Sequence, residues 1–172
     1  MAEPMASWIE LWPLAADEAR IWLLSGTGPW ESTLPVMSDG DPLFEARDTL
    51  WSNGALDPPL LVHGTSWRVD GQRFLLTHVA VIGVRGLVLD AWPNAQPVSL
   101  ELANAVGKPL PYHPAEAPTP RYIDVLLHAI RHLRFLLDTD DGNAAAFDEH
   151  WRKHLKRLRP ALAGMYRMDK PA

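Results

Sequence analysis

Four histidines near the end of the chain have a spacing that suits metal binding. His128 and His132 are four residues apart in one predicted helix, and His150 and His154 are four apart in the next. Residues four apart lie on one helical face, and imidazole nitrogens are common zinc ligands. If the two helices pack antiparallel around Asp141, the two pairs lie at the same height and can share one ion. The alternative is four separate histidines, some in water and some hydrogen-bonded.

A second group of candidate residues follows a predicted hairpin and the helix before it. Arg68 and Arg73 are predicted to face each other, which would form an anion site near the hairpin tip. The alternative is that each arginine reaches water or a separate acid. Trp67 belongs either to an aromatic binding surface or to the core. The full set of candidate ligand-binding residues is Arg47, Asp48, His63, Trp67, Arg68, Arg73 and His78.

The hairpin itself is predicted for residues 60–82, folded back through Asp70-Gly71. Asp-Gly between apolar and β-branched runs is typical of a two-residue type I′ turn. Both faces are apolar near the base, so we expect this pair of strands to be central rather than at a sheet edge. The predicted partners are Val69 with Gln72, Trp67 with Phe74, Arg68 with Arg73, and His63 with His78.

Hydrophobic periodicity and turn residues predict the remaining elements. We expect a strand at 7–14, helices at 17–25 and 41–53, and a long loop at 26–40, followed after the hairpin by strands within 84–92 and 98–102 and an extended proline-rich segment at 107–120. Helices at 121–137 and 143–159 should form an antiparallel pair. The predicted class is α+β, with a small, mostly antiparallel sheet built around the central hairpin and covered by helices.

The helix at 41–53 and the hairpin after it resemble the Nudix hydrolases. The box of that family places a Gly, a Glu, an Arg-Glu pair and a Glu-Glu pair before a closing Gly. With the closing Gly aligned on Gly54, Arg47 falls on the Arg and Asp48 on the Glu after it. Asp39 then falls on the first Glu and Thr33 on the first Gly.

Two box positions differ in a way that affects chemistry. Trp51 and Ser52 stand where the family has the adjacent carboxylates that hold magnesium, and hard cations need such oxygen ligands. The resemblance covers residues 33–82 and therefore implies a Nudix-like scaffold that has lost standard hydrolysis. The chain also resembles uncharacterised actinobacterial proteins of about this length, which implies no particular function.

Composition sets the broad class of the protein. A chain of 172 residues with 47% hydrophobic and 22% charged content predicts one globular domain, residues 1–172. Cysteine is absent, which excludes disulfides and thiolate metal sites. There is no leader pattern and no apolar run approaching the roughly 20 residues of a membrane span, so we expect a soluble, cytoplasmic protein without membrane contact.

Charge is unevenly distributed along the chain. From His150 onward there are seven Lys or Arg residues and one Asp, a balance of +6, so residues 1–149 must carry −11 to give the total of −5. A basic segment can bind nucleic acid. We favour the alternative, a solvated helix face near the acidic part of the same chain.

These observations lead to three functional hypotheses. The favoured one is a non-catalytic ligand-binding or regulatory protein on a degenerate Nudix-like scaffold, with the ligand between the sheet and loop 26–40. The first alternative is a metal-dependent hydrolase that uses the histidines or Asp39, Glu45 and Asp48. The second alternative is an interaction protein that docks through its basic C-terminal helix. The sequence carries no motif for a particular cofactor and indicates neither a partner nor an oligomeric state.

Overall fold

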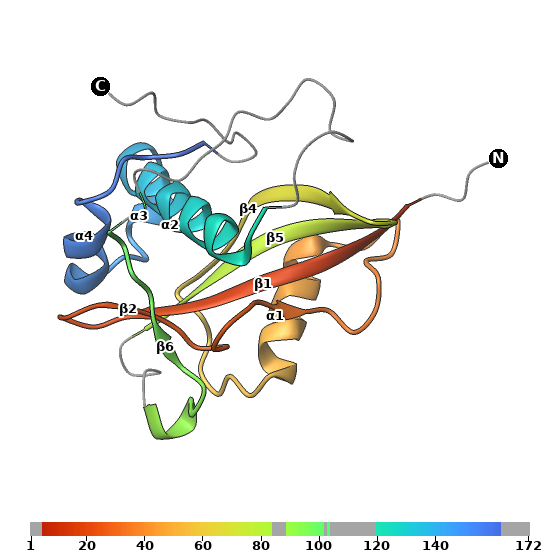
Figure 1. Cartoon of the computed structure of the whole chain (residues 1–172), viewed down its shortest axis with the longest axis horizontal. Helices are drawn as coiled ribbons and strands as arrows, with labels where there is room; N and C mark the ends of the chain where they lie inside the picture. The colour runs from red at the N-terminus through yellow and green to blue at the C-terminus, as the bar shows by residue number, and fades with distance from the viewer. Residues whose placement is uncertain (1–4, 84–88, 102, 104–119, 163–172) are drawn as a thin grey trace.

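The computed structural model describes residues 5–83, 89–101, 103 and 120–162, and it shows a six-stranded mixed sheet between two helical layers (Figure 1). The strands are β1 (Ala6–Ala16), β2 (Ile21–Leu23), β3 (Trp30–Glu31), β4 (Leu61–Asp70), β5 (Arg73–Ile82) and β6 (Gln96–Pro97). The helices are α1 (Pro42–Ser52), the 3-10 turn η2 (Leu89–Ala91), α2 (Tyr122–Thr139), α3 (Asp141–Ala144) and α4 (Glu149–Leu155). None of these helices is long and apolar enough to cross a membrane.

Strand β1 lies at the centre of the sheet, whose order is β4-β5-β1-β2-β6, with β3 also paired to β1. It runs parallel to β5 over ten residue pairs, from Ala6 opposite Arg73 to Ala15 opposite Ile82. The prediction of a mostly antiparallel sheet was therefore wrong, since the longest pairing of β1 is parallel. Every residue from Ile9 to Ala16 is buried, as expected for a strand covered on both faces.

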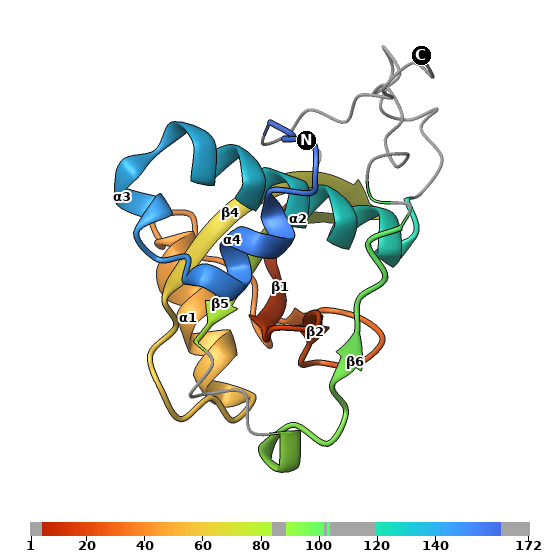
Figure 2. The ribbon, with the colours of Figure 1, turned by 90° about the vertical axis from the view of Figure 1, so that its left-hand side faces the viewer.

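Helices cover both faces of the sheet (Figure 2). Even-numbered β1 residues such as Trp12 and Leu14 pack against α2 and α4 in one hydrophobic core. The odd-numbered residues Ile9 and Leu11 pack against α1 in a second core. The period of two along a strand thus separates a face toward α2, called the α2 face below, from a face toward α1, called the α1 face.

The β4–β5 hairpin forms where it was predicted, but its register differs. The loop is Gly71-Gln72, so Asp70 pairs with Arg73. Gly71 has φ of 60°, and no non-glycine residue among those described has a positive φ. A turn with a positive φ only at its first central residue is type II′ rather than type I′. The loop is therefore displaced by one residue from the predicted Asp70-Gly71, and each predicted cross-strand partner near the turn is displaced by two.

Three further features of the hairpin differ from the prediction. Trp67 lies opposite Leu76 rather than Phe74, although it stacks diagonally on the Phe74 ring at 5.0 Å. His63 pairs with Val79 and not with His78, because the turn moves each partner by two residues and the bulge between Gly64 and Ser66 moves it back by one. Within the described sheet, β4 is an edge strand, so only β5 occupies the central position that we predicted for both.

The segment before α1 contains a wrongly predicted helix. Residues 17–25 form a turn and then β2, because the Asp17 carboxylate accepts hydrogen bonds from the backbone N–H groups of Ala19 and Arg20. An Asp of this kind caps a turn as well as a helix, and pairing with β1 selects the turn. The loop at 26–40 partly joins the sheet through β3 and a bridge between Ser7 and Val36.

Helix α1 confirms the prediction for 41–53 closely. Asp41 caps it by accepting from the N–H of Leu43, Pro42 opens it, and Gly54 follows it with φ of 98°. A positive φ just after a helix favours glycine.

After β5, the strand expected within 84–92 is not formed by the residues that are described, since 89–91 is a 3-10 turn and 84–88 lies outside the described part. The strand expected at 98–102 is replaced by β6, two residues earlier. The predicted extended segment at 107–120 falls almost entirely outside the described residues.

The predicted last helix, at 143–159, is not one continuous helix in the structure. Helix α2 confirms the prediction for 121–137, but residues 143–159 contain the end of α3, a break and the short α4. Asp148 restarts the helix by accepting from the N–H of Trp151. Arg131 and Arg134 of α2 donate to backbone carbonyls at and after the end of α4, and these bonds tie the two helices together.

Candidate functional site

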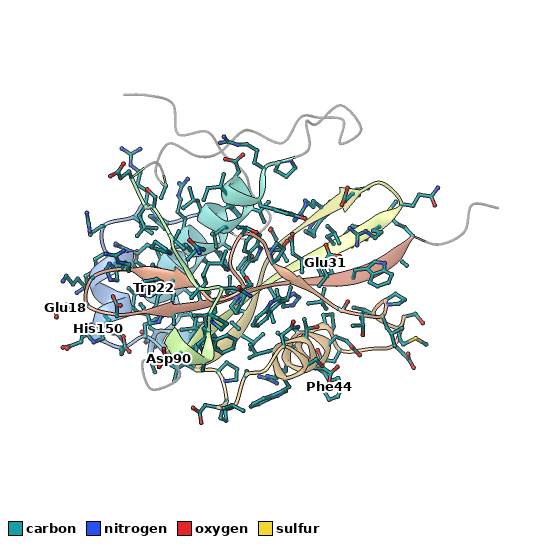
Figure 3. All side chains as sticks on the ribbon, turned by 60° about the horizontal axis from the view of Figure 1, so that its bottom comes forward. Glu18, Trp22, Glu31, Phe44, Asp90 and His150 are labelled. Carbon is teal, nitrogen blue, oxygen red and sulfur yellow. The ribbon has the colours of Figure 1, made fainter. Side chains whose placement is uncertain are left out.

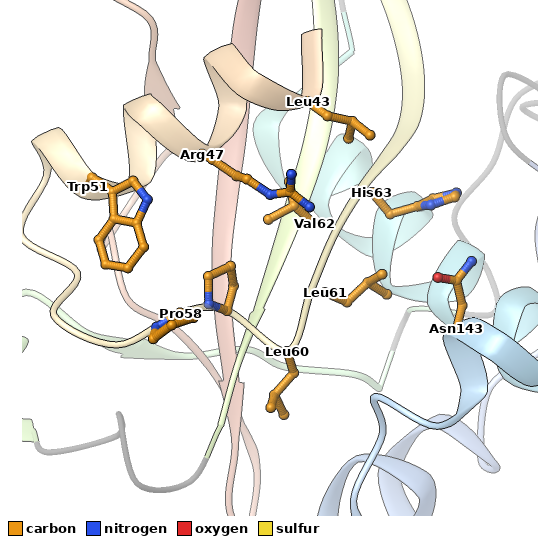
Figure 4. Close-up of a pocket in the computed structure, with 10 residues that line it drawn as sticks. Leu43, Arg47, Trp51, Pro58, Leu60, Leu61, Val62, His63 and Asn143 are labelled. Atoms are coloured by element: carbon orange, nitrogen blue, oxygen red, sulfur yellow. The ribbon is translucent and has the colours of Figure 1, made fainter. Parts of the chain in front are cut away.

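A pocket of 470 Å³ lies where α1, the start of β4 and α3 meet (Figure 4). Three α1 residues, Leu43, Arg47 and Trp51, form one wall. They are spaced four apart and therefore lie in one stripe along the helix. The other lining residues are Pro58, Pro59, Leu60, Leu61, Val62, His63 and Asn143.

The pocket follows the outer edge of β4 rather than one face of it. Residues 60–63 line it consecutively, although successive side chains in a strand point to opposite faces. A run of this kind can line one pocket only where the edge of the strand forms the floor. The position of β4 at the end of the described sheet agrees with this geometry.

Arg47 supplies the positive charge of the site. Figure 4 shows its side chain extending from α1 toward Val62, with Leu43 and Trp51 on either side. Arg47 is exposed, and it makes no hydrogen bond or ion pair with any residue that the structure describes. A guanidinium has five donors in a planar fork that matches a carboxylate or phosphate. Arg47 is therefore available to an anionic ligand.

His63 borders the pocket on the side toward α2. Its ring stacks on that of His132 at 5.3 Å, and His132 stacks in turn on Phe135 at 5.6 Å. Burial lowers the pKa of His63, while the charge of Asp140 acts in the opposite direction and leaves the net shift downward. His63 is therefore neutral at pH 7 and offers one donor and one acceptor.

Asn143 completes the lining from α3. Its side-chain nitrogen donates to Asp140 Oδ2 at 2.9 Å, and its backbone N–H donates to Asp140 Oδ1 at 3.0 Å. Asp140 is the N-cap of α3. The cap thus fixes the amide on the rim of the pocket, and the site combines a cation, a neutral imidazole and an amide with apolar walls.

Of the seven predicted ligand-binding residues, the structure brings only Arg47 and His63 together in this pocket. Asp48 is exposed on α1 but does not line it. Trp67 is 54% exposed on the α1 face of the hairpin, far along β4. His78 is buried, and burial lowers its pKa. No residue of loop 26–40 lines this pocket, so it is not the ligand cleft that we predict beside that loop.

The predicted anion site at the hairpin tip was wrong, because the two arginines are not opposite each other. Arg68 pairs with Leu75 across the strands and forms a salt bridge with Glu10. Arg73 bridges Glu31 at 2.7 Å and Asp70 at 3.2 Å. Each arginine thus reaches separate acids, as the alternative held.

Glu10 is a residue whose importance the sequence analysis missed. It is fully buried in β1 and accepts from both terminal nitrogens of Arg68 and, at 2.8 Å, from Thr77 Oγ1. An acid in the middle of an apolar central strand was the signal that could have identified it. A buried carboxylate of this kind requires a cation.

The predicted four-histidine metal site is not formed. No three His, Asp or Glu side chains in the described part of the chain are grouped so that they could hold an ion. His132 Nδ1 donates to the carbonyl of Ala161 at 3.0 Å, and His154 Nε2 donates to that of Asp17 at 2.8 Å. The half-exposed His150 lies at the end of the molecule that carries Glu18 (Figure 3). The break before α4 separates the pairs.

His128 lies inside the α2 core. Burial, together with the nearby His132 and Arg131, lowers its pKa to about 4. His132 is also buried, and its pKa is lowered mainly by burial. Both imidazoles are therefore neutral at pH 7 and act as core residues.

Comparison with known proteins places the chain in no family, since no family model matches it and no curated protein is significantly similar.

Proposed function

We propose that the protein binds, without catalysing a reaction, an anionic ligand with apolar groups in the pocket between α1 and β4. The observation that carries this proposal is the Arg47 guanidinium, which extends over an apolar pocket and has no ion-pair partner among the described residues. A hydrogen bond to a charged group contributes about 1.5–3 kcal/mol. Ligand pockets typically combine apolar walls with a few such polar groups.

The lining supports binding rather than catalysis. None of its ten residues is an Asp, Glu, Ser, Thr or Lys, so it holds no carboxylate to work with His63 as an acid–base pair. A pocket containing both Arg47 and Asp48 beside unpaired carboxylates would favour the metal-dependent hydrolase, but Asp48 does not line this pocket. The position of Trp51 in the wall fits the proposed degenerate Nudix-like scaffold, where this position would otherwise carry a magnesium ligand.

The hypothesis of docking through the C-terminal helix receives less support. It would be favoured by an exposed apolar stripe on α4, but Trp151, His154 and Leu155 are buried. Two basic α4 side chains are engaged with the chain itself, since Arg152 donates to the carbonyls of Ala144 and Phe147 and Lys153 to that of Glu18.

A thermal-shift screen of organic carboxylates and phosphate esters, with calorimetry on the hits, tests the proposed function. Arg47→Gln should weaken binding of a hit roughly 10- to 100-fold, the equivalent of the energy of one charged hydrogen bond. Lys156→Gln removes one exposed cation just after the end of α4, away from the pocket, and is the matched control. Hits that bind Arg47→Gln as tightly as the unmodified protein would contradict the proposal.

A further inference from the structure

We infer that the occupant of this pocket is an extended peptide that pairs with the edge of β4 as an added strand, an inference that rests on the proposed function. The floor of the pocket is the strand edge at residues 60–63. An unpaired edge presents a row of backbone N–H and C=O groups, which an extended peptide can use for hydrogen bonds.

The direction of the backbone groups can be worked out from the hairpin. The two-residue turn makes Asp70 and Arg73 a hydrogen-bonded pair, and backbone groups alternate in direction along an antiparallel strand. Arg73 and the other odd-numbered residues of β5 therefore face β4, and the β4 residues paired with even-numbered β5 residues point outward. Before the bulge, these outward residues are Val62, opposite Ala80, and Gly64, opposite His78. Among the described residues, neither makes a backbone hydrogen bond outside the hairpin. The two residues can therefore pair with an incoming chain.

Features at either end limit the length of the added strand. The bulge between Gly64 and Ser66 interrupts the regular ladder, and bulges commonly terminate pairing at an edge. Pro58 and Pro59 precede the strand and have no N–H to offer. The available edge thus spans about four residues, or roughly 13 Å of extended chain.

The wall formed by α1 matches a peptide of that length and specifies its side chains. Leu43, Arg47 and Trp51 are four residues apart, which is about 6 Å per step along a helix. Alternate side chains of an extended peptide are about 6.6 Å apart on one face. The peptide should therefore carry an acidic residue opposite Arg47, with an apolar residue two positions before it and another two positions after it.

The charge beside the strand edge favours a peptide over a second copy of the same strand. Among the described elements, helix α1 lies on one side of the pocket and Asn143 of α3 on the other (Figure 4). The Arg47 guanidinium on the α1 side favours an acidic partner. Residues 60–63 contain no acid, so pairing of this edge with the same edge of another copy would leave Arg47 unmatched.

Selection of phage-displayed random seven-residue peptides on the immobilised full chain tests this inference. Enriched peptides should contain the pattern apolar-x-acid-x-apolar. A synthetic peptide of the consensus should lose 10- to 100-fold in affinity when its acid is changed to the amide. That change should have little effect on binding to Arg47→Gln, because the two groups act as a pair.

Methylation of single peptide amides then tests strand pairing. Methylation at alternate positions of the peptide, either the odd or the even ones, should reduce affinity at least tenfold, because only alternate N–H groups point at β4. Methylation at the positions between them should not reduce affinity. Val62→Pro removes an outward N–H of β4 and should weaken binding of the same peptide, and circular dichroism checks that the variant folds.

The outcomes separate this inference from the proposed function. Small carboxylates that bind through Arg47, with no enriched peptide or no dependence on amide parity, would overturn the inference and keep the function. If the enriched peptides carry no acid whose contribution to affinity depends on Arg47, both the inference and the proposed function are overturned. An absence of all binding would also overturn both. Self-association lost in Val62→Pro, measured by sedimentation, would identify a second copy as the occupant and overturn the peptide inference.

Discussion

The pKa of His128 predicts a specific loss of stability in mild acid. This imidazole is buried in α2, and burial lowers its pKa from 6.5 to about 4, with smaller contributions from His132 and Arg131. The folded protein therefore binds its proton less readily than the unfolded chain does. The stabilisation is fully present above pH 6.5 and is lost as the pH falls from 6.5 toward 4.

The size of the effect follows from the shift. A difference of 2.5 pKa units corresponds to about 3 kcal/mol over the whole window, at about 1.4 kcal/mol per unit. By pH 5, the loss due to this one histidine should reach about 2 kcal/mol. His63, His78 and His132 also have lowered pKa values and add to the total.

Comparison with His128→Gln isolates the contribution of this residue. Urea unfolding followed by tryptophan fluorescence at pH 7 and pH 5 gives the loss of unfolding free energy for each protein, and groups common to both cancel. The unmodified protein should lose about 2 kcal/mol more than the variant. His150→Gln, which removes a half-exposed imidazole of α4, is the control. Equal losses in the unmodified protein and His128→Gln would refute the reasoning.

Three further predictions follow. Arg68→Met should lower the unfolding free energy by about 3–5 kcal/mol, because it leaves the buried Glu10 without its cation, and the double variant with Glu10→Met should recover much of that loss in urea unfolding. Asp41→Ala should cost about 1 kcal/mol in the same assay through loss of the α1 cap, and an unchanged midpoint would show that the cap contributes nothing. With magnesium, the protein should release no phosphate from nucleoside diphosphate derivatives, and release that disappears in Asp48→Asn would instead establish hydrolysis.

The parts of the fold that depend on local chemistry were the parts that could be predicted. Helix α1 was correct because Asp41, Pro42 and Gly54 define its ends within the segment itself. The hairpin was located correctly, but its register depended on whether one or two turn residues take a positive φ. Nothing in residues 6–16 indicates that their partner is β5, because parallel pairing joins segments distant in sequence.

The candidate site was predictable only in part, for a related reason. Arg47 and His63 could be identified as candidates, yet they meet because β4 begins beside α1. Pro58, Pro59 and Asn143 also line the pocket, but nothing in the sequence indicates that they lie near Arg47 and His63. The histidine pairs had convincing spacing, but Asp148 restarts the chain as a new helix, and the predicted alignment of the two pairs is lost.

The parallel pairing of β1 with β5 has a consequence for the order of folding during synthesis. β1 cannot acquire this neighbour until residue 82 has been made, 66 residues after β1 ends at residue 16. At about 5–20 residues per second, that interval lasts roughly 3–13 seconds. Throughout it, the apolar run from Ile9 to Ala16 has only its local partners β2 and β3. The newly made chain therefore exposes its future central strand for seconds, a window in which a chaperone would bind and in which aggregation would begin.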